Sequence, residues 1–200
     1  MSWITQINLV GKHAILVPLS MDHCDDLIDS VKDGELWKLW YATVPPPEDM
    51  AEEIQHRIES QNKGTMLPFA ILDKKSMRAI GMTTFFKISE KDRRLDIGWT
   101  WYRKNCQKTP INTECKLLLL THAFETLNCV AVGFGANYFN QNSRRAIERL
   151  GAKMDGIIRN WRIMPNSTVC DFCVYSIIDS EWKAVKVNLE SKLNSYEMTE

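Results

Sequence analysis

Residues 96–125 read DIGWTWYRKNCQKTPINTECKLLLLTHAFE, which combines a strand, a tight polar loop and an apolar helix. The strand is expected to end at Tyr102, and the helix to run from about Asn112, its N-cap, to Leu127. Apolar residues surround the helix, so we expect it to be buried. The first turn of a helix carries unpaired N–H groups and partial positive charge, so the joint predicts an anion site. An ordinary connection that binds nothing is the alternative.

The flanking sequence alternates between apolar strand patterns and helical spacing, with polar connectors between them. Strands are expected at residues 13–19, 66–73, 79–88, 94–102, 129–136, 156–164 and 169–178. Helices are expected from Met21 after the cap Ser20, at 48–61, at 112–127, at 142–150 before Gly151, and from about Glu181. This order predicts one α+β domain over residues 1–200, with a mixed sheet of about seven strands flanked by helices.

Composition bounds the classes of function. Lys+Arg and Asp+Glu each total 25, and a nucleic-acid binder would show a basic surplus, so no nucleic-acid partner is expected. No apolar run approaches the roughly 20 residues that span a bilayer. The N-terminus lacks a secretory pattern, and we expect a cytoplasmic protein without membrane contact. Cys170 and Cys173 point to opposite faces of one predicted strand, so we expect reduced thiols and no metal site.

A second candidate site lies in ANYFNQNSRRAIERLGA, residues 136–152. Asn140 and Ser143 stand where a strand ends and a short helix begins. Their amide and hydroxyl groups can bind the peptide-like units of an extended ligand. Helix capping is the ordinary role of both residue types and is the alternative interpretation.

Together these segments resemble one known family. Residues 96–163, followed by DFCVYSIIDSEW, are similar to the GNAT superfamily of acetyl-CoA-dependent N-acetyltransferases, above all to the branch with the ribosomal-protein N-acetyltransferases. The resemblance extends from about Lys12 to Leu193. Its most specific parts are IGWTW, NTEC with LLLLTHAFE, the N-x-x-S-x-x-A-I-E-x-L-G run and YSIIDSEW. It implies a GNAT fold and acetyl transfer from acetyl-CoA to a primary amine, either a protein N-terminus or a small molecule.

The resemblance implies that the polar loop holds the cofactor's pyrophosphate. The family pattern is Gln/Arg-x-x-Gly-x-Gly/Ala, and Gln107, Pro110 and Asn112 occupy its fixed positions. Pro110 offers no N–H, whereas the ammonium of Lys108, where relatives often have glycine, can contact a phosphate. We therefore expect weaker or differently posed CoA binding. The implied cofactor contacts are Trp99, Thr100, Trp101, Gln107, Lys108, Thr109, Ile111, Asn112, Thr113, Asn140 and Ser143.

The resemblance also implies that the cofactor lies between two diverging strands, here residues 95–102 and 129–136. Gly98 suits a β-bulge, where the backbone approaches a ligand closely. A main-chain N–H near Trp99–Trp101 is then expected to polarise the thioester carbonyl and to stabilise the oxyanion.

Three side chains are candidates for proton transfer. Asp96 is the first choice for the general base, since it precedes the expected bulge. A carboxylate that faces the edge of the sheet, or that forms a salt bridge near Arg93 or Arg94, is the alternative. Glu35 is the second choice, because the early helices of the family border the acceptor groove. Ser143 is the candidate general acid, since this chain has an isoleucine where many relatives have a tyrosine that acts as the general acid.

Acceptor recognition is least defined by the sequence. Trp37, Trp40 and Tyr41, followed by Pro45–Pro47, are candidates for the wall of an acceptor groove, with core packing as the alternative. Two functions stay open: an acetyltransferase, or a degenerate GNAT fold that binds CoA or another ligand without catalysis and acts as a regulatory or interaction module. Either a monomer or a homodimer is compatible with the chain.

Overall fold

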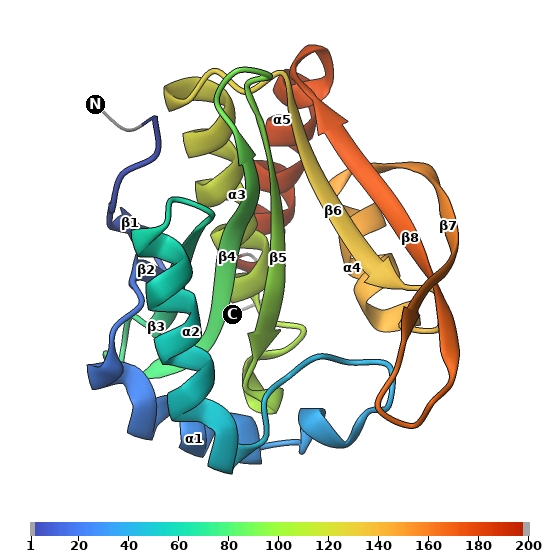
Figure 1. Cartoon of the computed structure of the whole chain (residues 1–200). Coiled ribbons are helices and arrows are strands. Elements are labelled where there is room, and N and C mark those ends of the chain that lie inside the picture. The colour runs from blue at the N-terminus through green and yellow to red at the C-terminus, as the bar shows by residue number, and fades with distance from the viewer. Residues whose placement is uncertain (1–2, 198–200) are drawn as a thin grey trace.

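The structure is a computed structural model that describes residues 3–197, and a β-sheet forms its centre (Figure 1). Among the described residues eight strands form this sheet, in the order β1-β2-β3-β4-β5-β6-β8-β7. They are β1 (Leu9–Val10), β2 (Ala14–Pro18), β3 (Met66–Asp73), β4 (Ala79–Ser89), β5 (Arg94–Tyr102), β6 (Ala131–Asn137), β7 (Lys153–Ile163) and β8 (Val169–Ile178). β5 and β6 are parallel, and the other neighbours are antiparallel. The predicted mixed sheet is confirmed, with the two-residue β1 as its additional strand.

Helices cover both faces of the sheet. They are α1 (Cys24–Lys32), α2 (Met50–Asn62), α3 (Pro110–Thr121), α4 (Gln141–Leu150) and α5 (Asp179–Glu197), with short helical turns at Met21–His23, Leu36–Lys38, Pro47–Asp49, Lys104–Cys106 and His122–Thr126. α1 and α2 lie on one face, and α3, α4 and α5 lie on the other (Figure 1). Leu27 and Ile54 pack in the first core, and Leu119 and Leu189 pack in the second. The expected α+β architecture is therefore confirmed.

The start of α3 differs from the prediction. The helix begins at Pro110, and Thr109 rather than Asn112 is its N-cap. The Thr109 hydroxyl accepts the N–H of Ile111 at 3.4 Å and donates to the carbonyl of Cys106 at 2.7 Å. Proline is favoured at the first helical position because its fixed φ suits the helix and no N–H is needed there. Part of the expected loop is therefore the first turn of the helix.

Other local expectations can be compared with the structure. α4 ends at Gly151, whose φ of 105° lies in the left-handed region, as the prediction of a glycine stop requires. All six cysteines are free, and Cys170 and Cys173 are buried. Between Trp3 and residue 197, no cluster of histidine, cysteine or carboxylate side chains could hold a metal ion. No helix in that part of the chain is long and apolar enough to cross a bilayer.

The separation of β5 from β6 positions the candidate site. The two strands pair only from Arg94 to Asp96 on β5 and from Ala131 to Gly133 on β6. Beyond Asp96 they diverge, and Figure 1 shows the ribbons moving apart toward the ends at which both strands finish. This is the arrangement of diverging central strands that the resemblance implied.

Candidate active site

Asp96 lies at the point where β5 and β6 separate. It is opposite Gly133 in the last pair of the ladder, and a Cβ added to Gly133 would lie 2.1 Å from Asp96 Oδ1. Only glycine leaves room there for the carboxylate. The side chain is largely buried, and Asp96 Oδ2 accepts a hydrogen bond from Lys87 Nζ at 2.9 Å. The expected alternative, a salt bridge with a neighbouring arginine, is wrong in its partner, because Lys87 on β4 reaches the carboxylate instead.

A β-bulge interrupts β5 directly after this point. Thr84 pairs with Gly98 and Met82 pairs with Trp101, so two residues of β5 stand opposite one residue of β4. Trp99 carries the left-handed φ of the bulge, 52°. Gly98 serves another purpose, since a Cβ there would lie 2.7 Å from the Phe86 ring. The bulge is present where the sequence predicted it, although Trp99 and not the glycine adopts the unusual conformation.

The helices that follow the two diverging strands begin at the same edge of the sheet. β5 and β6 run in parallel, and α3 and α4 are the helices that come next along the chain. Their N-termini therefore lie at the end of the sheet where β5 and β6 diverge, and the N–H groups and helix dipoles there favour anions. Asn140 is the N-cap of α4, and its side-chain oxygen accepts the N–H of Ser143 at 3.0 Å. The capping role expected as the alternative for Asn140 is thus present.

The polar loop before α3 presents backbone donors. Lys108 has a left-handed φ of 62°, a conformation that glycine adopts most easily, which suits the glycine that relatives often have at this position. Within residues 3–197, the backbone N–H groups of Lys108 and Thr109 have no protein acceptor. The N–H of Asn112, in the first turn of α3, has no partner inside the helix. Gln107 donates its side-chain amide to the Tyr102 carbonyl at 3.3 Å and so braces the loop.

Some predicted cofactor contacts lie away from the cleft. Thr113 is buried within α3, and its hydroxyl accepts a hydrogen bond from Arg149 at 3.4 Å. Trp101 is 4% exposed and packs in the core between the sheet and α2. The Thr100 hydroxyl faces the interior on the α3 side, where Lys116 donates to it at 2.9 Å. Of the three bulge-region residues, only Trp99 is exposed, at 37%.

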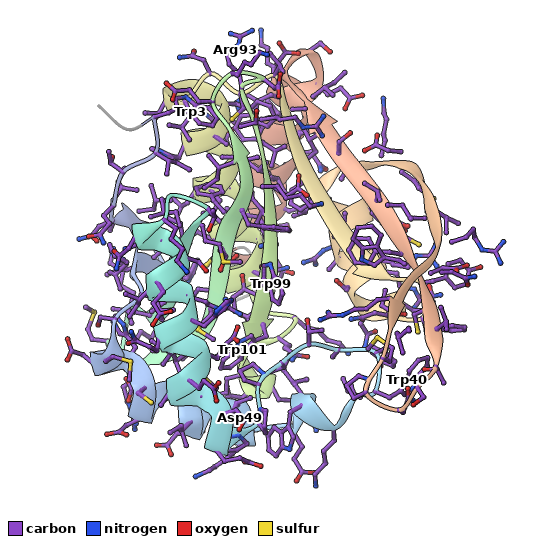
Figure 2. The ribbon with its side chains drawn as sticks, in the orientation of Figure 1. Trp3, Trp40, Asp49, Arg93, Trp99 and Trp101 are labelled. Carbon is purple, nitrogen blue, oxygen red and sulfur yellow. The ribbon has the colours of Figure 1, made fainter. Side chains whose placement is uncertain are left out.

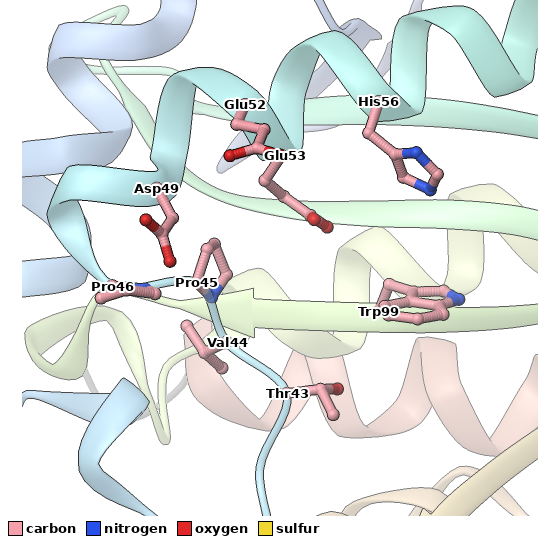
Figure 3. Close-up of a pocket in the computed structure, with 9 residues that line it drawn as sticks. All are labelled: Thr43, Val44, Pro45, Pro46, Asp49, Glu52, Glu53, His56 and Trp99. Carbon is pink, nitrogen blue, oxygen red and sulfur yellow. The ribbon is translucent and has the colours of Figure 1, made fainter. Parts of the chain in front are cut away.

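A cavity of about 390 Å³ lies in front of the bulge, on the face of the sheet that α2 covers (Figure 3). Its lining is Thr43, Val44, Pro45, Pro46, Asp49, Glu52, Glu53, His56 and Trp99. Three carboxylates from the first turns of α2 and the segment before it point along one side, and the Trp99 ring lies on the other (Figure 3). The sequence alone does not mark these carboxylates as a site, because acidic residues in the first turn of a helix ordinarily complement its dipole.

The Arg57 guanidinium packs against the Trp99 ring. This guanidinium is 2% exposed; it donates to Glu53 at 2.7 Å and to the Thr84 hydroxyl at 3.0 Å, and it lies 5.7 Å from the centre of the Trp99 ring. Burial lowers the pKa of Arg57, and Glu53 opposes this effect. One of its nitrogens, Nη2, is buried without a partner in the described part of the chain. The arginine therefore fixes both a wall of the cavity and one of its carboxylates.

The predicted acceptor residues Trp37, Trp40 and Tyr41 do not line this cavity. Trp40 contacts Phe139, with ring centres 5.5 Å apart, and Tyr41 at 5.6 Å. Figure 2 shows Trp40 well away from Trp99, near the hairpin of β7 and β8. Trp37 packs against the core of α1 and α2, so core packing, its alternative, applies. Glu35 is exposed and pairs with Lys38 at 2.6 Å. Neither Trp37 nor Glu35 lines the cavity.

Comparisons with known proteins agree with this geometry. Residues 13–153 match the family model described as an acetyltransferase (GNAT) domain. The chain is 30% identical over 106 residues to YdaF of Bacillus subtilis (strain 168), named provisionally as a ribosomal N-acetyltransferase. That match covers 53% of this chain and 57% of YdaF, so it spans less than two thirds of that protein.

Two solved structures extend the comparison over most of the chain. A provisionally named acetyltransferase from T. thermophilus is 31% identical, with a TM-score of 0.83 and coverage of 96% of this chain and 99% of the other. RimL, a ribosomal L7/L12 α-N-protein acetyltransferase solved with coenzyme A, shares the fold at 18% identity, with a TM-score of 0.74 and coverage of 87% and 99%. The expected GNAT family is confirmed. The chain belongs to the GNAT acetyltransferase family.

Proposed function

We propose that this protein transfers the acetyl group of acetyl-CoA to a primary amine. The observation that carries the proposal is the divergence of β5 and β6 beyond Asp96, because the helices that follow these two strands begin at the diverging ends and the bulge at Trp99 lies on β5 in the same region. An anionic cofactor suits the helix N-termini, and the carbonyl of a thioester suits a main-chain N–H donor at a bulge. Membership of the GNAT family supports the same chemistry.

The loop before α3 and the start of α4 are the proposed seat of CoA. The backbone N–H groups of Lys108, Thr109 and Asn112 are the donors proposed for the pyrophosphate, and the Lys108 ammonium adds charge. Pro110 removes one donor from this set but starts the helix in a favourable conformation. Asn140, which follows β6, is proposed to contact the pantetheine arm through its side-chain NH₂ group, because its side-chain oxygen already caps α4. The proline thus reduces the number of donors without closing the seat.

The proposed reaction is direct attack by the amine. The amine nitrogen forms a bond to the acetyl carbon, the carbon–sulfur bond breaks, and the sulfur leaves as the thiolate of CoA. Asp96, at the point where the strands part, is proposed to accept the amine proton. A main-chain N–H of the bulge stabilises the negative charge on the carbonyl oxygen. Ser143 is proposed to donate a hydrogen bond to the leaving sulfur.

The acidic cavity in front of the bulge supports an amine as the acceptor. Asp49, Glu52 and Glu53 share this cavity with Trp99. An ammonium group is attracted by carboxylates and by the face of an aromatic ring. Both a protein N-terminus and a small-molecule amine carry such a group, so the two remain the proposed acceptor classes. The tryptophan joins the cavity to the bulge, which places the acceptor beside the proposed thioester position.

Calorimetric titration with acetyl-CoA tests the cofactor seat. Lys108→Ala and Asn140→Ala are expected to weaken binding several-fold, because each removes one proposed contact. Lys91→Ala is the matched control: it removes the same charge from an exposed turn at the opposite end of β5 and should leave binding unchanged. Wild-type protein that gives no heat and no thermal shift at millimolar acetyl-CoA would overturn the proposal.

Turnover tests the chemistry separately from binding. Release of CoA is followed with a thiol reagent while primary amines and peptides with free N-termini are supplied. Asp96→Asn is expected to lower kcat by on the order of 100-fold and to leave the affinity for acetyl-CoA unchanged. Tight binding of CoA without turnover of any amine would instead establish the degenerate, ligand-binding alternative.

A further inference from the structure

Lys116 is a lysine inside the core of the molecule, directly behind the bulge. Its residue is 6% exposed, on the side of α3 that faces the sheet. Its Nζ donates to the Thr100 hydroxyl at 2.9 Å and approaches the Thr83 hydroxyl at 3.3 Å. Those two hydroxyl oxygens lie 2.7 Å apart. Within residues 3–197, no carboxylate is a partner of this ammonium group.

A buried ammonium without a counter-ion is expensive for the fold. Burial lowers the pKa of Lys116 from 10.5 to about 8, so the group is mostly protonated at neutral pH. Methionine or leucine would fill the same space without the loss of hydration. Two β-strands nevertheless direct hydroxyl groups at this one nitrogen. A buried cation held by two hydroxyl groups directly behind the bulge is therefore a candidate for a functional role.

The hydrogen bonds of Lys116 lead to the backbone of the bulge. Thr100 belongs to the bulge, and its hydroxyl donates to the Gly98 carbonyl at 3.3 Å. The Gly98 carbonyl and the Trp99 N–H belong to one planar peptide unit and point in opposite directions. A hydrogen bond that fixes the carbonyl therefore also fixes the N–H. The path from Lys116 through Thr100 ends on the peptide unit that carries the strained residue of the bulge.

We propose that Lys116 is a positioning residue for acetyl transfer, which acts through Thr100 to hold the Gly98–Trp99 peptide unit in the orientation that receives the thioester carbonyl. This inference rests on the proposed function. With its proton, Lys116 donates to Thr100 and leaves the Thr100 hydroxyl hydrogen free for the Gly98 carbonyl. Without it, the neutral amine becomes an acceptor that competes for the same hydrogen. The protonated form is therefore the one that orders the bulge.

Among the groups that surround Lys116, Lys116 is the one that titrates near pH 8. Cys115 precedes it on α3, and burial raises the pKa of that thiol to about 12. Tyr102 on β5 interacts with Cys115, and burial raises the pKa of Tyr102 well above 10. β4 and β5 face the ammonium with Thr83 and Thr100, which do not titrate in this range.

Three variants test the proposal by turnover. Lys116→Met removes the donor, Thr100→Val breaks the path to the backbone, and Thr83→Val is the matched control. Both valine variants remove one hydroxyl partner of Lys116, but only the Thr100 hydroxyl bonds to the Gly98 carbonyl. We expect kcat to fall on the order of ten-fold in the first two variants, less than two-fold in the third, and KM for acetyl-CoA to stay within two-fold throughout. The decline of kcat above about pH 8 should be present in Thr83→Val and absent from Lys116→Met.

A spectroscopic measurement tests the same path without activity. Gly98–Trp99 is the only Gly-Trp step in the sequence, so glycine labelled with carbonyl ¹³C and tryptophan labelled with ¹⁵N mark this peptide unit alone. Its carbonyl shift should titrate near pH 8 in wild type and in Thr83→Val, and should not do so in Lys116→Met or Thr100→Val. A flat shift in folded wild type, or equal kcat losses in the two valine variants, would overturn the positioning role. If no amine is turned over but the carbonyl shift of the Gly98–Trp99 unit still titrates, the proposed function would be refuted and the path from Lys116 to the bulge would stand.

Discussion

Replacing Lys116 with methionine is expected to stabilise the protein, most strongly below pH 8. Burial lowers the pKa of Lys116 in the folded state from 10.5 to about 8, whereas the unfolded chain keeps the ordinary value. Between those two pH values the unfolded state binds more protons than the folded state. Stability therefore rises with pH across this window in wild type, and it is lowest where the lysine is charged in both states.

The size of the effect follows from the shift in the pKa of Lys116. A change from 10.5 to about 8 corresponds to a destabilisation of about 3 kcal/mol at neutral pH, because one pKa unit is about 1.4 kcal/mol. Roughly 2 kcal/mol of this should be recovered when the pH rises from 7 to 9.5. Lys116→Met lacks the titrating group, and the Thr83 and Thr100 hydroxyls can still bond to each other at 2.7 Å.

Urea unfolding at pH 7, 8, 9 and 9.5 measures the prediction as a difference between two proteins. Cysteine residues also titrate in this range: burial raises the pKa of Cys129 to about 11, which lowers stability as the pH rises above 9. Because both proteins contain these thiols, their contribution largely cancels in the difference. Lys183→Met, at an exposed position on α5, is the control and should show no pH-dependent difference. Parallel stability curves for wild type and Lys116→Met would refute the reasoning.

Two further predictions concern buried carboxylate contacts. Glu114→Ala is expected to destabilise the protein by at least about 3 kcal/mol. The Glu114 carboxylate accepts hydrogen bonds from the N–H groups of Lys12, His13 and Ala14, and the desolvation of these groups would be uncompensated in the variant. Urea unfolding measures the loss of stability, and a loss below about 1 kcal/mol would contradict the prediction. Glu53→Ala is expected to lower the free energy of unfolding by about 3–5 kcal/mol, because the buried Arg57 guanidinium loses its carboxylate partner. Glu52→Ala is the control at an exposed position. Equal melting temperatures for the two variants would count against this account.

Most of the fold could be predicted because it is encoded locally. The strands of the meander are continuous apolar or alternating segments, and the helices have capping residues and apolar spacing. The error at the start of α3 also has a local cause. Asn112 and Thr109 are both good caps, and Pro110 selects between them, because proline is favoured in the first turn and Asn112 then falls inside the helix.

The candidate site was only partly predictable, because its geometry depends on contacts between distant segments. The bulge could be expected from the family pattern, and so could the cofactor loop. The roles of Arg57 and Lys116 could not, since each lies on a helix where a basic residue ordinarily faces solvent. Arg57 meets Thr84, 27 positions away, and Lys116 meets Thr83, 33 positions away. Nothing in the local sequence indicates either contact.

These two contacts have the same form on opposite sides of the sheet. Thr83 and Thr84 are adjacent on β4, so their side chains point to opposite faces, and each meets a buried cation. Lys116 comes from α3 on one face and Arg57 from α2 on the other, where it also lies over the Trp99 ring. The bulge of β5 is opposite these threonines. A core selected for stability alone would not place two costly cations around one irregular stretch of strand. Glu53 neutralises the charge of Arg57, whereas Lys116 has only hydroxyl partners within residues 3–197. Lys116 is therefore the cation that favours negative charge at the bulge backbone in the proposed acetyl transfer.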